Sequence, residues 1–389
     1  MKVIFVLTNG YMYGDNKALY NLMPKLMSYG VSPLMIIPMN SDANRIFRKL
    51  SIPVINYHDK DYSSIYFQKI VSSGSIVKDF LIKCKFVAKS LFFSKKEFND
   101  IIKSVADFGP DIIHTNNSGC VLGFKLAKRL GVKHVWHIRE YGDLDANWSY
   151  FPSKYHILRR LNDKQNYNIT ITNDIKMHFS LKGNVSVIYD GPLKNEQQPI
   201  IIGEKDSYFL FVGRLFPKKG VELLLMSMKE VVSIVPECRL FIAGDGDCSY
   251  TKYLESFVKE KGLQKSVQFL GYRTDIPILM QKAKAVIVPS ESEAFGFITA
   301  EAISNGALVI GRNTAGTKEQ MDNVDIAMKK DFCIRFSNRQ ELIGAMVKVW
   351  NMNIKVNELI QASNIVRQIY SAEESSAKLF DCLNSIIIK

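Results

Sequence analysis

Short apolar runs that are typical of buried strands alternate along this chain with stretches of helical periodicity, and this alternation limits the folds open to it. In the first half, the strand-like runs cover residues 3–7, 34–37, 111–114, 134–138 and 169–172. Strands that alternate with helices are typical of parallel sheets covered by helices. The series restarts at Tyr208, after a polar segment that contains Pro192 and Pro199. We therefore expect two α/β domains.

The length of the chain agrees with this division. At 389 residues, 47% of them hydrophobic, it exceeds what one core usually organises. We expect a first domain over residues 1–190, a linker over 191–206 and a second domain over 207–372. Ligands of open α/β sheets bind beyond the carboxyl ends of the strands, so the functional site should lie there.

Two carboxylates of the second half surround the expected start of a helix. Glu293 lies on a polar loop after an apolar run, and Glu301 lies on the helix that follows, with seven residues between them. Both can therefore face one ligand. Free backbone N–H groups near Gly296, Phe297 and Ile298 favour an anion there, such as phosphate. The pair would also fit a general acid and base, or a solvated loop beside a helix-surface glutamate.

A second segment places cations at the end of a strand. In YFLFVGRLFPKKG, residues 208–220, the apolar run ends at Gly213, and Arg214, Lys218 and Lys219 follow before an amphipathic helix. A guanidinium and an ammonium at one strand end can neutralise a diphosphate and stabilise the charge that develops when it leaves. A surface turn with basic residues is the alternative interpretation.

Together these segments resemble the retaining glycosyltransferases of the GT-B class known as family 4, whose signature is a Glu, seven residues, Glu pattern after a Pro-Ser strand end. The resemblance implies an α/β fold of two Rossmann-like domains that face each other across a cleft. It also implies that a C-terminal amphipathic helix, at about 373–389, crosses back to the first domain.

The resemblance further implies roles for the residues of the second domain. Arg214 and Lys219 would grip the diphosphate of a nucleotide sugar, with Gly213 and Lys218 beside them. Glu301 would bind the ribose hydroxyls, and Glu293 would hold hydroxyls of the donor sugar near the reacting carbon.

Two more segments follow at the offsets that the family shows. RLFIAGDGD contains Gly244 and Gly246, and VQFLGYRTDI contains Tyr272 and Arg273. A lone Gly-x-Gly is weak evidence for a nucleotide site, but here it is one element of an ordered series. The resemblance places the nucleotide base near Tyr272 and Arg273.

The first domain should carry the acceptor side. Its opening strand leads into a loop with Gly10 and Gly14 and a helix that begins near Asn16. Glycine lets such a loop approach a diphosphate or a sugar closely. Family members commonly have a Gly-Gly pair here, and only Gly14 matches it.

Histidines lie at two strand ends of the first domain, in DIIHTNNS and HVWHIREYGDLD. A lone histidine is more often structural than catalytic, but the joint location of His114 and His137 at the expected cleft favours function. Many relatives have a second histidine where this chain has Asn116, which can bind a sugar hydroxyl but cannot act as an acid or base. The HIRE segment resembles a variant of bacterial surface-polysaccharide transferases. It suggests His137 and Arg139 as contacts of the donor sugar or the acceptor.

Positive charge is concentrated in the first domain. Residues 1–190 hold 26 Lys and Arg against 15 Asp and Glu, a net charge of +11, whereas the remainder has +2. Residues 75–98 place apolar and lysine side chains on separate stripes of an expected helix. Such a helix can lie in an anionic membrane surface, or it can pack on its own sheet with its lysines in solvent. Finger, helix-turn-helix and aromatic-basic RNA motifs are absent from the sequence, which argues against a nucleic-acid partner.

The compartment can be read in part. Six cysteines show neither CxxC nor paired-ligand spacing, so neither a zinc site nor a disulfide framework is indicated. The N-terminal apolar run is too short for a signal peptide, and no run approaches the roughly 18 apolar residues that span a bilayer. We expect a cytoplasmic protein, at the inner face of the cell membrane if residues 75–98 dock there.

The activity implied by the resemblance is transfer, with retention, of a hexose-type sugar from a UDP- or GDP-linked donor to a glycan or lipid-linked glycan in surface-polysaccharide synthesis. We expect Glu293, His137, Arg214 and Lys219 to act in the reaction, without a metal, another cofactor or a protein nucleophile. The leaving diphosphate would help to deprotonate the incoming hydroxyl. Two alternatives remain: another GT-B enzyme, such as a sugar-nucleotide epimerase or a glycan phosphorylase, and a non-catalytic partner that binds a sugar nucleotide to support a second transferase.

Overall fold

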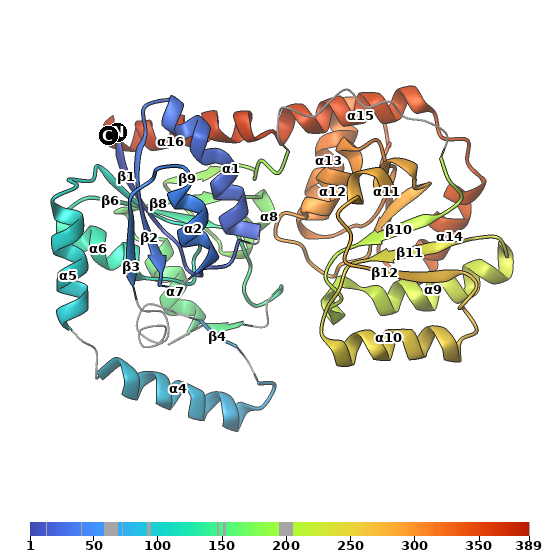
Figure 1. Ribbon diagram of the computed structural model, residues 1–389, viewed down its shortest axis with the longest axis horizontal. Helices are drawn as coiled ribbons and strands as arrows, with labels where there is room; N and C mark the ends of the chain where they lie inside the picture. The colour runs from blue at the N-terminus through green and yellow to red at the C-terminus, as the bar shows by residue number, and fades with distance from the viewer. Residues whose placement is uncertain are drawn as a thin grey trace. The chain divides into compact units, whose positions relative to one another are not determined.

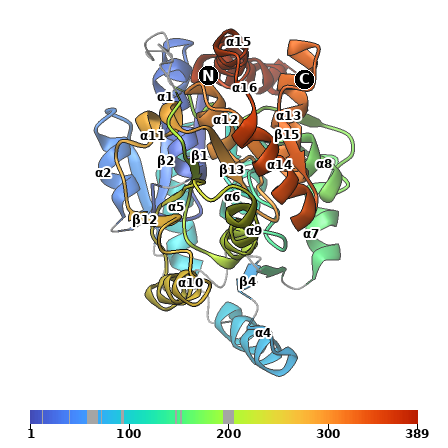
Figure 2. The same ribbon diagram turned by 90° about the vertical axis from the view of Figure 1, so that its right-hand side faces the viewer.

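The computed structural model describes two compact units (Figures 1 and 2). Unit 1 contains Met1–Gly191 together with Ala372–Lys389, and unit 2 contains Pro192–Ser371. The described residues are 1–12, 14–39, 41–57, 69–71, 73–91, 95–145, 148–150, 153–193 and 205–388. The linker expected at 191–206 therefore lies outside the described residues from 194 to 204.

Seven parallel strands form the sheet of unit 1 among the described residues. In spatial order they are β3 (Val54–Tyr57), β2 (Ser32–Pro38), β1 (Lys2–Val6), β5 (Ile112–Thr115), β6 (Lys133–Ile138), β8 (Asn166–Thr170) and β9 (Val185–Val187). A separate antiparallel pair joins β4 (Lys69–Val71) to β7 (Trp148–Tyr150). Five of these strands overlap the runs expected in the first half of the chain.

Side chains alternate along each strand and therefore point to opposite faces of this sheet, and both faces are buried. Val3 and Phe5 of β1 join one core cluster, and Ile4 and Val6 join the other. Among the described residues, the helices of unit 1 are α1 (Gly14–Ser28), α2 (Asp42–Arg48), α4 (Ile76–Leu91), α5 (Lys95–Ala106), α6 (Leu122–Leu130), α7 (Lys154–Leu161), α8 (Asn173–His178) and α16 (Ala372–Ile388). Residues of α1, α2 and α16 belong to the first cluster, and residues of α5 and α6 belong to the second.

The strand expected over 169–172 ends earlier than its apolar run suggests. Thr172 is the N-cap of α8, where its side-chain oxygen accepts a hydrogen bond from Ile175 N–H at 3.2 Å. A threonine in this position satisfies one of the free donors at a helix start, which favours the helix over two more strand residues.

The single helix expected over residues 75–98 is wrong. Helix α4 ends at Leu91 and a second helix, α5, begins at Lys95.

Six parallel strands form the sheet of unit 2 among the described residues. Their spatial order is β12 (Val267–Gly271), β11 (Leu240–Ala243), β10 (Phe209–Val212), β13 (Ala285–Val288), β14 (Val309–Arg312) and β15 (Ile334–Phe336). The remaining elements are a 3₁₀ turn (Pro217–Lys219), α9 (Val221–Ile234), α10 (Cys248–Glu260), α11 (Ile276–Lys282), α12 (Phe297–Ser304), α13 (Ala315–Met328), α14 (Arg339–Asn351) and α15 (Val356–Ile369). In the described part of the chain, no helix has the length and apolar character needed to cross a membrane.

The C-terminal helix belongs to unit 1 although it follows unit 2 in sequence. Leu379, Leu383 and Ile386 of α16 are buried in the core cluster that also contains Leu19 and Leu22 of α1. Helices α1 and α16 lie side by side (Figure 1). Unit 1 is therefore built from two distant segments of the chain.

Shortening a buried side chain of α16 should loosen unit 1 alone. Leu379→Ala removes a fully buried side chain, and such changes typically cost about 2–5 kcal/mol of unfolding free energy. Native-state hydrogen exchange should show faster opening of β1 and unchanged opening of β10. Ile388→Ala, at a position that is 78% exposed, is the matched control and should leave both strands unchanged. Equal loss of protection in both units would contradict this packing.

Candidate functional site

The carboxyl ends of β10 and β13 lie next to each other because these strands are hydrogen-bonded neighbours. The loops that follow them touch. The carbonyl oxygen of Lys218 accepts a hydrogen bond from Glu291 N–H at 2.9 Å. Gly220 has a positive φ of 74°, and a Cβ there would lie 2.2 Å from the carbonyl oxygen of Pro289. Only glycine fits this approach, which fixes the basic loop against the acidic loop.

One predicted cation and one predicted carboxylate meet across these loops. The Nζ of Lys219 donates a hydrogen bond to Oε1 of Glu293 at 2.6 Å. Their side chains are 32% and 18% exposed. Partial burial strengthens such a pair relative to a fully exposed one. Arg214 follows the same strand and is exposed, with no ion pair among the described residues.

Two further strand ends are joined to this pair of loops. A Cβ on Gly244, after β11, would lie 1.9 Å from the carbonyl oxygen of Gly213, after β10. Gly244 N–H donates to the carbonyl oxygen of Gly271, at the end of β12, at 2.8 Å. Leu215 N–H donates to the carbonyl oxygen of Asp245 at 2.7 Å. The predicted glycines therefore allow the backbones of neighbouring loops to approach closely along the carboxyl edge of the sheet.

Helix α12 begins at the same edge. Its N-cap, Gly296, has φ of 90°, in the left-handed region that glycine tolerates, and no side chain caps the helix. The first two helical residues are Phe297 and Ile298, both partly exposed. Glu301 lies in the second turn and is half-buried. The start of this helix provides the N–H groups that the sequence suggested for an anion.

Helix α13 holds the loop that carries Glu293, a contact that the sequence analysis did not predict. Gly316 N–H donates to the carbonyl oxygen of Glu293 at 2.8 Å. The side-chain amide of Gln320 donates to the carbonyl oxygens of Phe295 and Gly296, the latter at 3.1 Å. These bonds fix the backbone of the loop up to the first residue of α12.

The residues expected near a nucleotide base lie after β12. Tyr272 is 76% exposed, so its ring is open to a ligand. Arg273 is exposed and donates from Nε to Oδ1 of Asp275 at 2.8 Å. The guanidinium is therefore already held in place by a carboxylate.

In unit 1, the predicted polar residues form a buried network at the carboxyl ends of β5 and β6. His114 Nε2 lies 3.1 Å from His137 Nδ1. Arg139 donates from Nε to Oδ1 of Asn116 at 2.9 Å, and its Nη1 forms an ion pair with Asp190. His114, His137 and Arg139 are at most 5% exposed. Asp190 was not predicted, because only the fold brings it to β6.

The contacts of Arg139 define the tautomer of His137. Arg139 Nη2 lies 3.3 Å from His137 Nδ1, and a guanidinium can only donate, so this nitrogen accepts. The proton of neutral His137 is then on Nε2, which has no hydrogen-bond partner among the described residues. Burial, followed by the charge of Arg139, lowers the pKa of His137 well below its usual value.

The loop after β1 contacts this network through Asn116. The side-chain amide of Asn116 donates to the carbonyl oxygen of Asp15 at 3.2 Å. Gly14 is the first residue of α1 and has φ of 40°. Asn16 is buried, and its amide donates to the carbonyl oxygen of Tyr11 at 2.8 Å. Asn116 thus joins the α1 start to Arg139.

Groups of three or more His, Cys, Asp or Glu that could hold a metal ion do not occur in the described parts of the chain. The expected independence of metal remains a prediction.

Both sheets have known counterparts among solved structures. The Anabaena protein HepE, solved in complex with UDP, superposes with a TM-score of 0.73 at 18% identity, over 99% of this chain and 100% of HepE. HepE has also been solved with UDP-glucose. The chain has the GT-B fold, which confirms the expected fold class.

Sequence comparison points to the same class. Residues 194–365 match the model of the family described as glycosyl transferases group 1. An uncharacterized glycosyltransferase of Methanocaldococcus jannaschii is 28% identical over 219 residues, 54% of this chain and 58% of that protein. The Escherichia coli UDP-Gal:alpha-D-GlcNAc-diphosphoundecaprenol alpha-1,3-galactosyltransferase is 27% identical over 192 residues, 45% of this chain and 47% of that enzyme. The matches span about half the length of these two relatives and support a glycosyltransferase of the GT-B type.

The buried histidines should make the stability of unit 1 depend on pH. Burial is the main cause that lowers the pKa of His114 and His134 to about 3. The unfolded chain therefore binds protons below about pH 6.5 that the folded unit cannot bind, so stability is lost as the pH falls from 6.5 towards 3. Between pH 7 and pH 5 each histidine should cost unit 1 about 2 kcal/mol.

Unit 2 is the internal control, because all six histidines precede residue 191. Hydrogen exchange, corrected for intrinsic rates, should show weaker protection of β6 at pH 5 than at pH 7, with β10 far less affected. His114→Gln should reduce the pH dependence for β6. A flat profile for β6 would show that the buried rings are protonated in the folded protein.

Proposed function

We propose that this chain is a retaining glycosyltransferase that moves a sugar from a nucleotide-sugar donor to a glycan or lipid-linked glycan in surface-polysaccharide biosynthesis. The observation that carries this proposal is the contact of Lys219 with Glu293 at interlocked strand ends, immediately before the uncapped start of α12. These residues lie within the segment that matches the glycosyltransferase family.

The diphosphate of the donor would bind between the β10 loop and the start of α12. Arg214 is exposed and offers a planar set of donors suited to phosphate oxygens. The N–H groups near Gly296, Phe297 and Ile298 add partial positive charge. Gly213 and Lys218 shape the loop beneath, and Gly213 contacts Gly244 through its backbone.

Lys219 exchanges partners when the donor binds. Its Nζ neutralises Glu293 in the structure, and a phosphate oxygen would take over this ammonium. Glu293 is then released to accept hydrogen bonds from hydroxyls of the donor sugar, while Glu301 on α12 accepts from the ribose. Because α13 fixes the backbone of the Glu293 loop, this exchange needs side-chain movement alone.

Uridine is the favoured base, with guanine as the alternative. HepE, which shares the fold, has been solved with UDP and with UDP-glucose, and the Escherichia coli relative is named for UDP-Gal. The exposed ring of Tyr272 gives a base a surface to stack on, and Arg273 lies beside it.

The polar network of unit 1 would meet the transferred sugar or the acceptor. The Nε2–H of His137 is a donor without a partner among the described residues, which supports a contact with a sugar hydroxyl. Asn116 and Arg139 are engaged with each other, so their role is to hold His137 and the start of α1 in place. A neutral His137 donates a hydrogen bond without adding positive charge.

The reaction would break the bond between the anomeric carbon and the diphosphate oxygen and form a bond to the acceptor oxygen on the same face. The departing diphosphate takes the proton of the acceptor hydroxyl, and Arg214 and Lys219 stabilise the negative charge. A lipid-linked acceptor is supported by the diphosphoundecaprenol in the name of the Escherichia coli relative.

A non-catalytic role is the second candidate, and Asn116 favours it. The family resemblance implies a histidine here in many relatives, whereas the Asn116 amide is bonded to Asp15 and Arg139. A partner subunit that only binds a sugar nucleotide would need the unit 2 site alone.

Turnover separates these two functions. Purified protein incubated with UDP- and GDP-linked hexoses should hydrolyse one donor slowly and transfer from it to a lipid-linked oligosaccharide. The anomeric configuration of the product, read by NMR, should match that of the donor. Binding of a donor without hydrolysis or transfer would favour the non-catalytic role.

Removing either proposed phosphate ligand should reduce turnover strongly. Arg214→Ala and Lys219→Ala each remove a charged hydrogen bond, typically about 1.5–3 kcal/mol, so kcat/KM should fall at least about tenfold. Lys252→Ala, which changes an exposed lysine of α10, is the control and should retain full turnover. Turnover of Arg214→Ala within about threefold of wild type would refute the phosphate assignment.

A further inference from the structure

Helix α4 presents apolar side chains to solvent. Ile76 is 90% exposed, Val77 69%, Phe80 63% and Leu81 61%. Both views show this helix at the outer edge of unit 1 (Figures 1 and 2). Transfer of such side chains out of water is favourable, and a cluster of them on one helix marks a contact surface.

The apolar side chains of α4 occupy one sector of the helix. At about 100° per residue, the four residues above and Cys84 fall within about 140°. Lys78 and Lys85 border one edge of this sector and Lys83 borders the other. On the opposite side, Asp79 and Ile82 are half-buried. A helix packed on its own sheet would bury the apolar sector, so that alternative does not hold for these described side chains.

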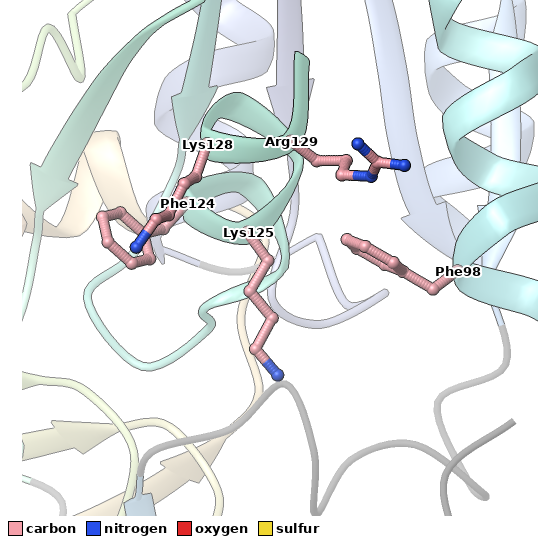
Figure 3. A pocket seen from close by; sticks show the side chains of 5 residues that line it. All are labelled: Phe98, Phe124, Lys125, Lys128 and Arg129. Carbon is pink, nitrogen blue, oxygen red and sulfur yellow. The ribbon is translucent and has the colours of Figure 1, made fainter. Parts of the chain in front are cut away.

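A cationic pocket lies near the start of α5, the helix that follows α4. It has a volume of about 420 Å³. Its lining residues are Phe98 on α5 and Phe124, Lys125, Lys128 and Arg129 on α6 (Figure 3). Among the described residues, the lining therefore combines two aromatic rings with three cations and no carboxylate.

Arg160 adds a fourth cation beside this pocket. Its guanidinium lies 5.7 Å from the centre of the Phe124 ring. Burial, followed by the charge of Arg160, lowers the pKa of Lys125. An anion would relieve this repulsion, and the rings would contact apolar groups attached to it. The chemistry suits a phosphate that carries a hydrocarbon chain.

We propose that unit 1 docks on an anionic lipid bilayer, with the apolar sector of α4 inserted among the headgroups and acyl chains and one anionic headgroup in the Phe98–Phe124 pocket. The lysines beside the apolar sector and the cations of the pocket would both be attracted to anionic headgroups. Buried apolar area and positive charge together determine how strongly a protein binds an anionic bilayer. Phe98 lies in the first turn of α5, so the pocket follows α4 closely along the chain. The proposal stands independently of the transfer reaction.

Vesicle co-sedimentation with the full chain tests this docking. The wild type should bind phosphatidylcholine vesicles that contain phosphatidylglycerol, and much less so pure phosphatidylcholine. Phe80→Ser with Leu81→Ser should weaken partitioning at least about tenfold, because two exposed apolar groups no longer enter the bilayer. The matched control is Ile234→Ser with Ile326→Ser, at exposed apolar positions on helices of unit 2, and it should bind as wild type.

The pocket needs its own pair of variants. Lys128→Glu with Arg129→Glu should weaken binding to anionic vesicles by about fivefold or more for each cation lost. Lys252→Glu with Lys259→Glu makes the same charge change on α10 and should have little effect. Thermal unfolding of every variant, together with donor hydrolysis, verifies that the fold and the unit 2 site persist.

Three outcomes would overturn the docking proposal. The first is absence of wild-type binding to anionic vesicles. The second is equal binding by the α4 variant and its control. The third is occupation by something other than a bilayer. If light scattering shows a dimer that Phe80→Ser with Leu81→Ser dissociates, the α4 surface binds a second copy of the chain. If inorganic phosphate stabilises the protein and vesicles do not bind, the pocket binds a free anion.

Discussion

Backbone-to-backbone contact at the carboxyl edge of the unit 2 sheet is the constraint on which the candidate site depends. A methyl group at Gly244 would collide with the carbonyl oxygen of Gly213, and one at Gly220 would collide with that of Pro289. Because these positions lack side chains, the loops after four neighbouring strands and the start of α13 form one hydrogen-bonded layer. Lys219 and Glu293 project from a backbone that is already ordered in the folded protein, so ligand binding does not have to order it. A ligand therefore meets groups that are already in place.

Unit 1 positions its polar groups in a different way. Its network is made of side chains that bond to one another below the surface, with Arg139 in contact with Asn116, His137 and Asp190. Burial lowers the pKa of Arg139 to about 10, and Asp15 opposes this shift. With that pKa, the guanidinium is still charged near neutral pH. Because it is buried, it needs the carboxylate of Asp190 as a partner. Removing Asp190 would leave the buried guanidinium without its ion-pair partner, so this residue is as important to the network as the histidines.

The sequence predicted those features that depend on residues close to one another along the chain. Apolar runs predicted the strands, because a strand buried on both faces must be apolar along its length, and β1 divides its side chains between two cores. Resemblance directed attention to Lys219 and Glu293, which are in contact, although their roles remain predictions. Gln320 and Asp190 could not be predicted, since each acts through a neighbour that only the tertiary fold supplies.

If both proposals hold, the uneven charge of the chain reflects two different tasks for cations. A soluble diphosphate is best held by a few partly buried groups, and Lys219 is 32% exposed beside a carboxylate with which it can exchange. Salt screens such a site weakly. Adhesion to a surface instead uses many exposed cations, each effective only within the Debye length of about 8–10 Å. The +11 charge of residues 1–190, against +2 for the rest, is the distribution that the proposed surface attraction in unit 1 and the proposed ligand binding in unit 2 would need. The two kinds of anion recognition can thus change independently of each other.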